Sequence, residues 1–279
     1  MAIEDEVGWR RVDRGDAEVW FADTMDDLPI VVLLHGLAGY GLEWRRTIEV
    51  LRDHFAVIAI DQRGHGASTR EPADVSRSAY VGDVLAVLDE LLVDAVTVIG
   101  QSMGAHTAML LAARAPERVH SLVMVEGGLG GGGPELTETV GHWLASWPAP
   151  FADRDEFAAF FGDNRFVADA WAAGLEERPD GLWPRWDAAT LTRALAPVHE
   201  REYVEEWARV WAPTLLVRGE LGSVPQRQVD LMRETRPQVE GCPPLEVATL
   251  AGIGHDVHLE APEGLHRLLG PFLEVDLRP

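Results

Sequence analysis

A serine stands between two glycines in the run Gly100–Gly104, which follows the apolar segment Val96–Ile99 and precedes a segment rich in Ala and Leu. A Gly-X-Ser-X-Gly run between a strand and a helix is typical of a sharp turn that exposes the serine hydroxyl at the end of a sheet. The glycines are needed because strand and helix converge there and leave little room for side chains. The pattern therefore predicts that Ser102 is a nucleophile.

A histidine suited to activate this serine lies near the end of the chain. His255 follows the apolar segment Leu245–Leu250, and two nearby glycines would let its loop fold over Ser102. The chain order serine, acid, histidine is the order used with a turn of this kind. His258 is a competing candidate, but we favour a packing role for it because it lies nearer the following helix.

Two backbone N–H groups are candidates for stabilising an oxyanion. The helix after Ser102 directs its N-terminal N–H groups and the positive end of its dipole toward the site, so Met103 N–H is the first donor. The second is expected from the loop His35–Gly39, which follows the apolar segment Ile30–Leu34 and is rich in small residues. Within this loop, Leu37 N–H is our candidate.

The elements that must position these groups form an α/β pattern. Short β-rich runs alternate with segments of helical spacing, which indicates βαβ units and a mostly parallel central sheet of about eight strands flanked by helices. Val7–Thr24 is expected to form an antiparallel opening hairpin. The later strands are expected at Ile30–Leu34, Val57–Ile60, Val96–Ile99, Leu122–Val125, Thr214–Val217 and Leu245–Leu250, and two of the helices at Tyr80–Leu92 and Met103–Arg114.

The interval 126–213 is too long for a simple crossover between strands. It opens on a glycine-rich run and is broken by several prolines, so we expect a helical cap at 127–211, inserted after strand six into a core of 1–126 and 212–279. The cap concentrates aromatic residues, which favours an apolar pocket wall. The residues predicted to line the substrate pocket are Trp143, Trp147, Trp183 and Trp186, with His35 and Gly36 from the core.

The composition excludes several classes of function. A formal net charge of −22 and a pI near 4.7 leave no basic surface for nucleic acid or an anionic membrane. The single cysteine, Cys242, excludes an intrachain disulfide and cysteine-based zinc or redox sites. No run approaches the ~18 apolar residues of a membrane span, and Met1–Arg10 does not resemble a signal peptide. We therefore expect a cytoplasmic protein.

Taken together, these motifs resemble the α/β-hydrolase superfamily, in the order found there and over nearly the whole chain outside the cap. The resemblance implies that His65 belongs to a structural turn and that His35 belongs to the oxyanion loop. The motifs that carry it are Val31–Gly36, Asp61–Ser68, Gly100–Gly104 and Gly254–His255.

The position of the candidate acid departs from the commonest pattern of that superfamily. The pattern places Asp three residues after a glycine that closes the seventh strand, and here that position, counted from Gly219, holds Gly222. The superfamily also accepts an acid after the sixth strand, where Glu126 follows Leu122–Val125. We favour Glu126 as the partner of the histidine, and Glu220 is the alternative.

The resemblance implies a serine hydrolase that cleaves an ester or lactone through an acyl-enzyme, and the aromatic residues of the cap favour a small, largely apolar substrate. It implies no metal and no organic cofactor. A C–C bond hydrolase or lyase of the same fold is an alternative, as is a homologue that binds a ligand without catalysis. We expect a monomer or a homodimer.

Overall fold

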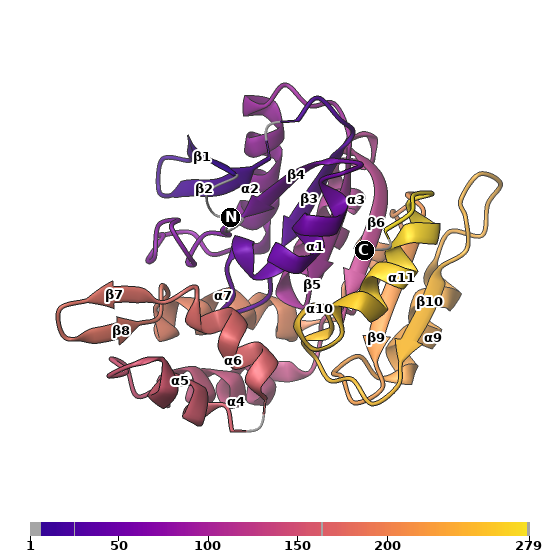
Figure 1. Cartoon of the computed structure of the whole chain (residues 1–279). Coiled ribbons are helices and arrows are strands. Elements are labelled where there is room, and N and C mark those ends of the chain that lie inside the picture. The colour runs from indigo at the N-terminus through magenta and orange to yellow at the C-terminus, as the bar shows by residue number, and fades with distance from the viewer. Residues whose placement is uncertain (1–6, 25, 163, 278–279) are drawn as a thin grey trace.

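The structure, a computed structural model, describes residues 7–24, 26–162 and 164–277 (Figure 1). The expectation about Met1–Arg10 falls in part on residues 1–6, which lie outside this set. Among the helices that are described, none has the length and apolar character required to cross a bilayer.

The core is an eight-stranded sheet in the order β1-β2-β4-β3-β5-β6-β9-β10. The first two strands form the expected antiparallel hairpin, β2 pairs antiparallel with β4, and all later neighbours are parallel. The predicted fold class is confirmed. The strands are β1 (Gly8–Asp13), β2 (Glu18–Asp23), β3 (Ile30–Leu34), β4 (Ala56–Ile60), β5 (Val96–Gln101), β6 (Val119–Val125), β9 (Thr214–Gly219) and β10 (Glu246–Leu250).

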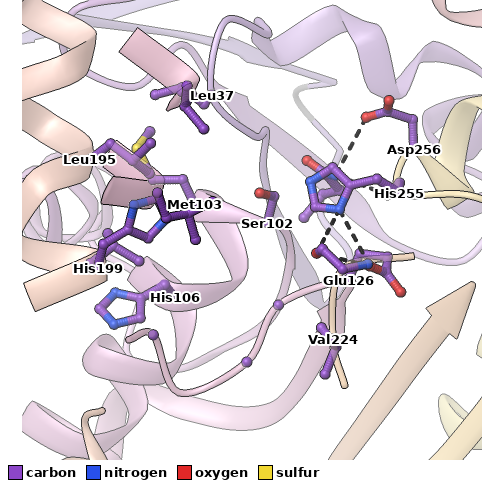
Figure 2. A pocket seen from close by; sticks show the side chains of 18 of the residues that line it. Leu37, Ser102, Met103, His106, Glu126, Leu195, His199, Val224, His255 and Asp256 are labelled. Carbon is purple, nitrogen blue, oxygen red and sulfur yellow. Dashed lines mark hydrogen bonds and ion pairs between the residues drawn. The ribbon is translucent and has the colours of Figure 1, made fainter. Parts of the chain in front are cut away.

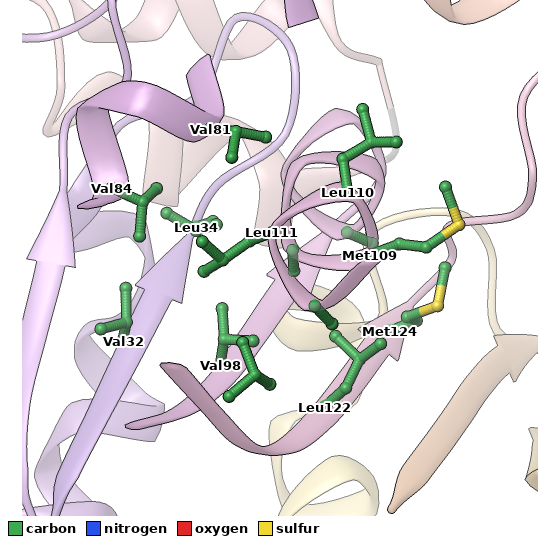
Figure 3. Packing of buried hydrophobic residues seen from close by; sticks show 14 of the residues in the cluster. Val32, Leu34, Val81, Val84, Val98, Met109, Leu110, Leu111, Leu122 and Met124 are labelled. Atoms are coloured by element: carbon green, nitrogen blue, oxygen red, sulfur yellow. The ribbon is translucent and has the colours of Figure 1, made fainter. Parts of the chain in front are cut away.

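Helices cover both faces of the sheet, because alternate residues of its central strands point to opposite sides. Val32 and Leu34 of β3 belong to the apolar layer that includes residues of α2, α3, α8 and α9, whereas Val31 and Leu33 belong to the layer on the other face, which includes residues of α1 and α11. Figure 3 shows the first of these layers, where Leu111 lies against Val98. The helices of the core are α1 (Arg45–Leu51), α2 (Arg77–Glu90), α3 (Met103–Arg114), α8 (Val204–Trp207), α9 (Gln226–Thr235), α10 (Val257–Glu260) and α11 (Pro262–Phe272), with short 3-10 turns η2 (Gly41–Trp44) and η3 (Pro116–Arg118).

The turn after β4 supports the loop after β3. Gln62 donates its backbone N–H to His35 Nε2 at 3.0 Å and its side-chain amide to His35 O at 2.6 Å. His65 is fully buried, its Nδ1 lies 3.0 Å from Arg63 O, and burial lowers its pKa to about 4. A neutral, buried ring in this position fits the structural turn that the sequence motif implies.

A separate layer of elements lies between β6 and β9 in the chain, over the edge at which β5 and β6 end (Figure 1). It contains the two-stranded hairpin β7–β8 as well as helices, whereas the sequence predicts a helical cap. Tyr203, Trp207 and Val210 pack with the core rather than with this layer, which favours a cap that ends after α7; the expected boundary at 211 stays a prediction. The elements are α4 (Gly133–Ala145), α5 (Arg154–Phe160), α6 (Arg165–Ala172), β7 (Glu176–Arg178), β8 (Gly181–Trp183) and α7 (Ala188–Glu200).

Candidate active site

Ser102 occupies the turn between β5 and α3 with φ 51° and ψ −116°, a backbone conformation that L-residues rarely adopt. The flanking glycines make this turn possible. A Cβ atom on Gly100 would lie 2.6 Å from Ala105 N, and one on Gly104 would lie 2.5 Å from His35 O. Backbone atoms cannot move aside for such contacts, so both positions require glycine.

Ser102 opens into a cavity of about 480 Å³ that lies between the core and the cap. Its hydroxyl makes no hydrogen bond to another described residue. Figure 2 shows Ser102 between the His255 ring and the wall that carries Met103 and Leu195. The predicted nucleophile and the predicted base therefore face the same space.

The His255 ring is held by two side chains at its Nδ1 edge. Ser223 Oγ lies 2.9 Å from Nδ1 and Glu126 Oε2 lies 3.3 Å from it. Figure 2 shows Glu126 below this edge of the ring. The opposite ring nitrogen, Nε2, is turned toward the side of the cavity on which Ser102 lies. The arrangement can accept a proton at Nε2 while the carboxylate stabilises the charged ring.

The carboxylate of Glu126 is fully buried and accepts several hydrogen bonds. Oε1 accepts from Gly219 N–H at 2.8 Å, and Oε2 accepts from Ser223 N–H at 2.6 Å and Ser223 Oγ at 3.1 Å. Burial alone would raise the pKa of Glu126, but the contact with His255 and these backbone donors lower it below its usual range. Glu126 is therefore ionised at neutral pH.

The pKa of His255 is raised above 6.5. Burial lowers it, but the hydrogen bond to Glu126 and the negative charges of Asp256, Glu126 and Glu260 together outweigh that effect. A raised pKa means that the ring binds a proton more strongly, which suits a base that takes up a proton during a reaction.

Glu126 and Gly222 compete for the same space. A Cβ atom on Gly222 would overlap the Glu126 carboxylate, so any side chain at 222 would force that carboxylate out of its present position. Glu126 itself has φ 48°, which turns its side chain from the end of β6 toward the end of β9. The glycine that departs from the common pattern is thus the residue that makes room for the carboxylate.

The alternative acid, Glu220, lies elsewhere. Its Oε2 accepts from Gly252 N–H at 2.8 Å, on an exposed part of the loop, and no hydrogen bond joins it to His255 within the described ranges. The geometry therefore favours Glu126 over Glu220.

The family model that describes the α/β hydrolase fold matches residues 29–262. The chain belongs to the α/β hydrolase fold family. Ser102, Glu126 and His255 all lie within the matched residues, on the ends of strands or on the loops that follow them.

Several relatives of this α/β hydrolase are named by activity. It is 29% identical to a 2-hydroxy-6-oxononadienedioate/2-hydroxy-6-oxononatrienedioate hydrolase of Cupriavidus pinatubonensis, over 94% of this chain and 93% of that protein. It is 26% identical to the N-formylmaleamate deformylase of Pseudomonas putida, over 88% of each chain. An uncharacterized Mycobacterium tuberculosis protein is 35% identical, but the alignment spans only 36% of this chain and 29% of that protein.

Among solved structures, E-2-(acetamidomethylene)succinate hydrolase superposes with a TM-score of 0.84 at 23% identity, over 96% of this chain and 100% of the other. An enol-lactonase from Burkholderia xenovorans superposes with a TM-score of 0.77 at 19% identity, over 95% and 100% of the two chains. At these identities the likeness shows the shared fold.

The two backbone donors predicted for the oxyanion are free in this hydrolase. Neither Leu37 N–H nor Met103 N–H donates to another described residue, and both residues line the cavity beside Ser102. Met103 begins α3, so its N–H has no partner within the helix. Both donors can therefore serve a ligand oxygen.

Of the six residues predicted to line the substrate pocket, the structure places only Trp143 on the cavity wall. Trp147 and Trp186 are 8% exposed, because their rings pack 4.8 Å apart inside the cap, and Trp183 donates to Asp180 in the β7–β8 hairpin. These tryptophans therefore pack the cap instead of lining the pocket.

The two core residues predicted to line the pocket, His35 and Gly36, also do not lie on the cavity wall. His35 is buried, with Nδ1 2.7 Å from Gly36 O, and Gly36 is covered by the side chain of Gln101. The competing base, His258, lies 3.0 Å from the buried carboxylate of Glu43, which agrees with a packing role.

Ser223 is the functional residue that sequence reasoning missed. Its neighbour Gly222 holds the position at which the superfamily pattern expects an acid, and that departure was the signal that pointed to this loop. In the part of the chain that the structure describes, no group of three or more His, Cys, Asp or Glu side chains is arranged to hold a metal ion.

We predict that Gly104→Ala lowers the free energy of unfolding by about 2–3 kcal/mol or more, because the new methyl group would press on the backbone of the loop after β3. Urea unfolding measures this change. The matched control is Gly82→Ala in α2, where the nearest atom is the flexible end of Arg14 at 3.0 Å, and which we expect to be neutral or slightly stabilising. Equal unfolding midpoints for the two variants would show that the turn does not need its glycine.

Proposed function

We propose that this α/β hydrolase is a serine hydrolase that cleaves an ester or lactone of a small, largely apolar substrate through an acyl-enzyme. The observation that carries the proposal is the His255 ring, fixed at Nδ1 by the ionised Glu126 and open at Nε2 toward the cavity that Ser102 enters. The named relatives, which include hydrolases and a deformylase, support hydrolase activity.

In the proposed reaction, Ser102 Oγ attacks the scissile carbonyl carbon while His255 Nε2 takes the hydroxyl proton. The carbonyl oxygen becomes an oxyanion that accepts from Leu37 N–H and Met103 N–H. When the tetrahedral intermediate collapses, the C–O bond breaks and His255 returns the proton to the leaving alcohol. Water then attacks the acyl-enzyme with the same base, which releases the acid and restores Ser102.

Ser223 acts as a positioning residue in this scheme. Its hydroxyl can accept from His255 Nδ1–H and donate to Glu126 Oε2, so one hydroxyl joins the ring to the carboxylate. The direct contact of 3.3 Å between the ring and the carboxylate runs beside it. Both contacts favour the tautomer in which Nε2 is free to take a proton.

The wall of the cavity supports an apolar substrate. Its cap side carries Leu136, Val140, Trp143, Phe161 and Trp171, and a volume of about 480 Å³ suits a small molecule.

A second candidate is hydrolysis of a C–C bond in a diketone, favoured by the 29% identical relative whose printed name is a 2-hydroxy-6-oxononadienedioate hydrolase. The same serine, histidine and oxyanion donors would serve both reactions. Parallel assays with aryl esters and with a vinylogous 1,5-diketone distinguish the two.

We predict that a fluorophosphonate probe labels the wild-type protein at Ser102 within minutes and that Ser102→Ala abolishes both labelling and ester hydrolysis, because only an activated serine reacts quickly. Mass spectrometry of the labelled peptide identifies the site. The control is Ser146→Ala, which removes an exposed cap hydroxyl bonded to Trp143 O and should change neither readout. A wild-type protein that resists the probe would point to a ligand-binding homologue without catalysis.

We predict that the acid limb of the pH profile of kcat/KM has its midpoint above pH 6.5, since activity needs neutral His255 and its pKa is raised. In Glu126→Gln the charge is lost and burial dominates, so the midpoint should move to lower pH. Turnover at neutral pH should also fall, by up to about 10⁴-fold if ring orientation is lost. Ser223→Ala should shift the midpoint in the same direction, but by a smaller amount. If the pH profile is unshifted in both variants, Glu126 and Ser223 have no role in the mechanism.

We predict that the acid can be moved from β6 to β9. In the wild type, Gly222→Asp should reduce activity, because its Cβ would overlap the Glu126 carboxylate. In the inactive Glu126→Gly variant, the same Gly222→Asp change should raise kcat/KM by about ten-fold or more. A double-mutant cycle of ester hydrolysis measures the coupling, and additive effects would mean that the two positions do not share one site.

A further inference from the structure

The wall of the cavity opposite His255 carries two histidines that the proposed mechanism does not use. His106 comes from the N-terminal part of α3 and His199 from the end of α7. Figure 2 shows their rings near each other, across Ser102 from His255. Both residues line the cavity. They bring polar atoms to an otherwise apolar wall.

His106 is buried without a hydrogen-bond partner. The residue is 2% exposed, and neither Nδ1 nor Nε2 meets a donor or acceptor among the described residues. Its ring packs edge-on against Tyr203, with centroids 4.5 Å apart. Buried polar groups in folded proteins are almost always hydrogen-bonded, and leaving one unpaired is unfavourable for folding. An unpaired imidazole on a cavity wall therefore points to a ligand.

The surroundings of the two rings leave ring nitrogens available to the cavity. His199 Nδ1 lies 3.0 Å from Thr137 Oγ1, which leaves its Nε2 without a partner within the described ranges. Gly130 also lines the cavity, and a Cβ atom there would stand 3.4 Å from His106 Nε2. A residue without a side chain thus borders the nitrogen.

The charges around this wall favour an uncharged group that accepts hydrogen bonds. The sequence contains no lysine, and no arginine is among the described residues of the cavity wall, whereas the acidic Glu126 and Asp256 are. Arg77 lies behind the wall and donates to Met103 O at 3.2 Å and to Thr107 Oγ1. Burial first, and then the charge of Arg77, lower the pKa of His106 well below 6.5, so the ring is neutral.

These charges have two consequences for a ligand. The positive field of Arg77 favours the negative end of a carbonyl or hydroxyl dipole at His106. A carboxylate would lose its hydration without a cation in contact, which is unfavourable in a buried site.

We propose that the substrate carries, at a distance from the scissile carbonyl, a second uncharged oxygen that accepts a hydrogen bond from His106 or His199. The inference deepens the proposed function by naming the substrate class: an apolar ester or lactone with a remote carbonyl or hydroxyl group. It also separates this protein from the relatives named for dioate substrates, since the described wall offers no cation to a second carboxylate.

The test uses binding, so that it does not depend on catalysis. Three linear secondary amides of equal length end in a methyl ketone, an ethyl group or a carboxylate, and the shared amide carbonyl occupies the oxyanion donors in each. Binding to the Ser102→Ala protein is followed by tryptophan fluorescence, because Trp143 and Trp171 line the cavity. We expect the ketone to bind about five- to ten-fold more tightly than the alkyl amide, and the carboxylate to bind more weakly than either.

Variants assign the effect to the histidines. Adding His106→Leu should reduce the affinity for the ketone to that for the alkyl amide, and retained binding of the alkyl amide is the internal control for folding. His199→Leu, at a half-buried position, is a second variant that should reduce the same ratio. His120→Leu, on an exposed part of β6, should leave the ratio unchanged.

Two results would overturn the inference: equal binding of ketone and alkyl amides, which would mean that the histidine nitrogens are satisfied by solvent, or tightest binding of the carboxylate. The corresponding aryl esters, assayed with wild-type protein, separate this failure from that of the proposed function. Hydrolysis of all three esters without preference for the ketone would support the serine hydrolase and exclude the subsite. Selective binding of the ketone amide without hydrolysis of any ester would support the subsite and exclude the serine hydrolase.

Discussion

The Glu126 carboxylate is held by three donors before it meets the histidine: Gly219 N–H, Ser223 N–H and the Ser223 hydroxyl. An ionised carboxylate in a fully buried position is unfavourable unless such donors replace its hydration. Because they hold it between the ends of β6 and β9, its charge acts at one edge of the His255 ring. The direction of Nε2, the raised pKa of the ring and the glycine at 222 all depend on that placement.

The sheet determines where these groups meet. Parallel neighbours β5, β6 and β9 end at one edge, so the turn at Ser102, the side chain of Glu126 and the loop of Ser223 come together there although they are distant in sequence. The histidine loop is attached to the same edge, since Gln101 donates from its side chain to His255 O at 3.1 Å. The strands are packed on both faces, which favours the fixed orientation of groups that such a reaction requires.

The sequence was sufficient to predict those parts of the site where steric constraints require a particular residue type at a fixed spacing. The turn at Ser102 is such a case, because only glycine fits at Gly100 and Gly104, two residues before and two residues after the serine. The tryptophans are the opposite case: Trp143 faces the cavity while Trp147 fills the cap, and that difference depends on how short helices face one another. The glycine at 222 pointed to this loop, but the role of Ser223 could not be derived from spacing alone, because it depends on the Glu126 carboxylate reaching Ser223 from the end of β6.

The polar groups of the cavity divide into two sets with different electrostatics. At the catalytic end an ionised carboxylate and a histidine of raised pKa stabilise charge that appears during a reaction. At the opposite end His106 is kept neutral by burial and by Arg77, so it can recognise a dipole but adds no charge. Between them the wall is largely apolar, and a ligand that satisfies both ends has one orientation relative to Ser102. Binding energy gained at the neutral end would then serve to position the scissile carbonyl, because the apolar wall alone does not distinguish the two ends of a substrate.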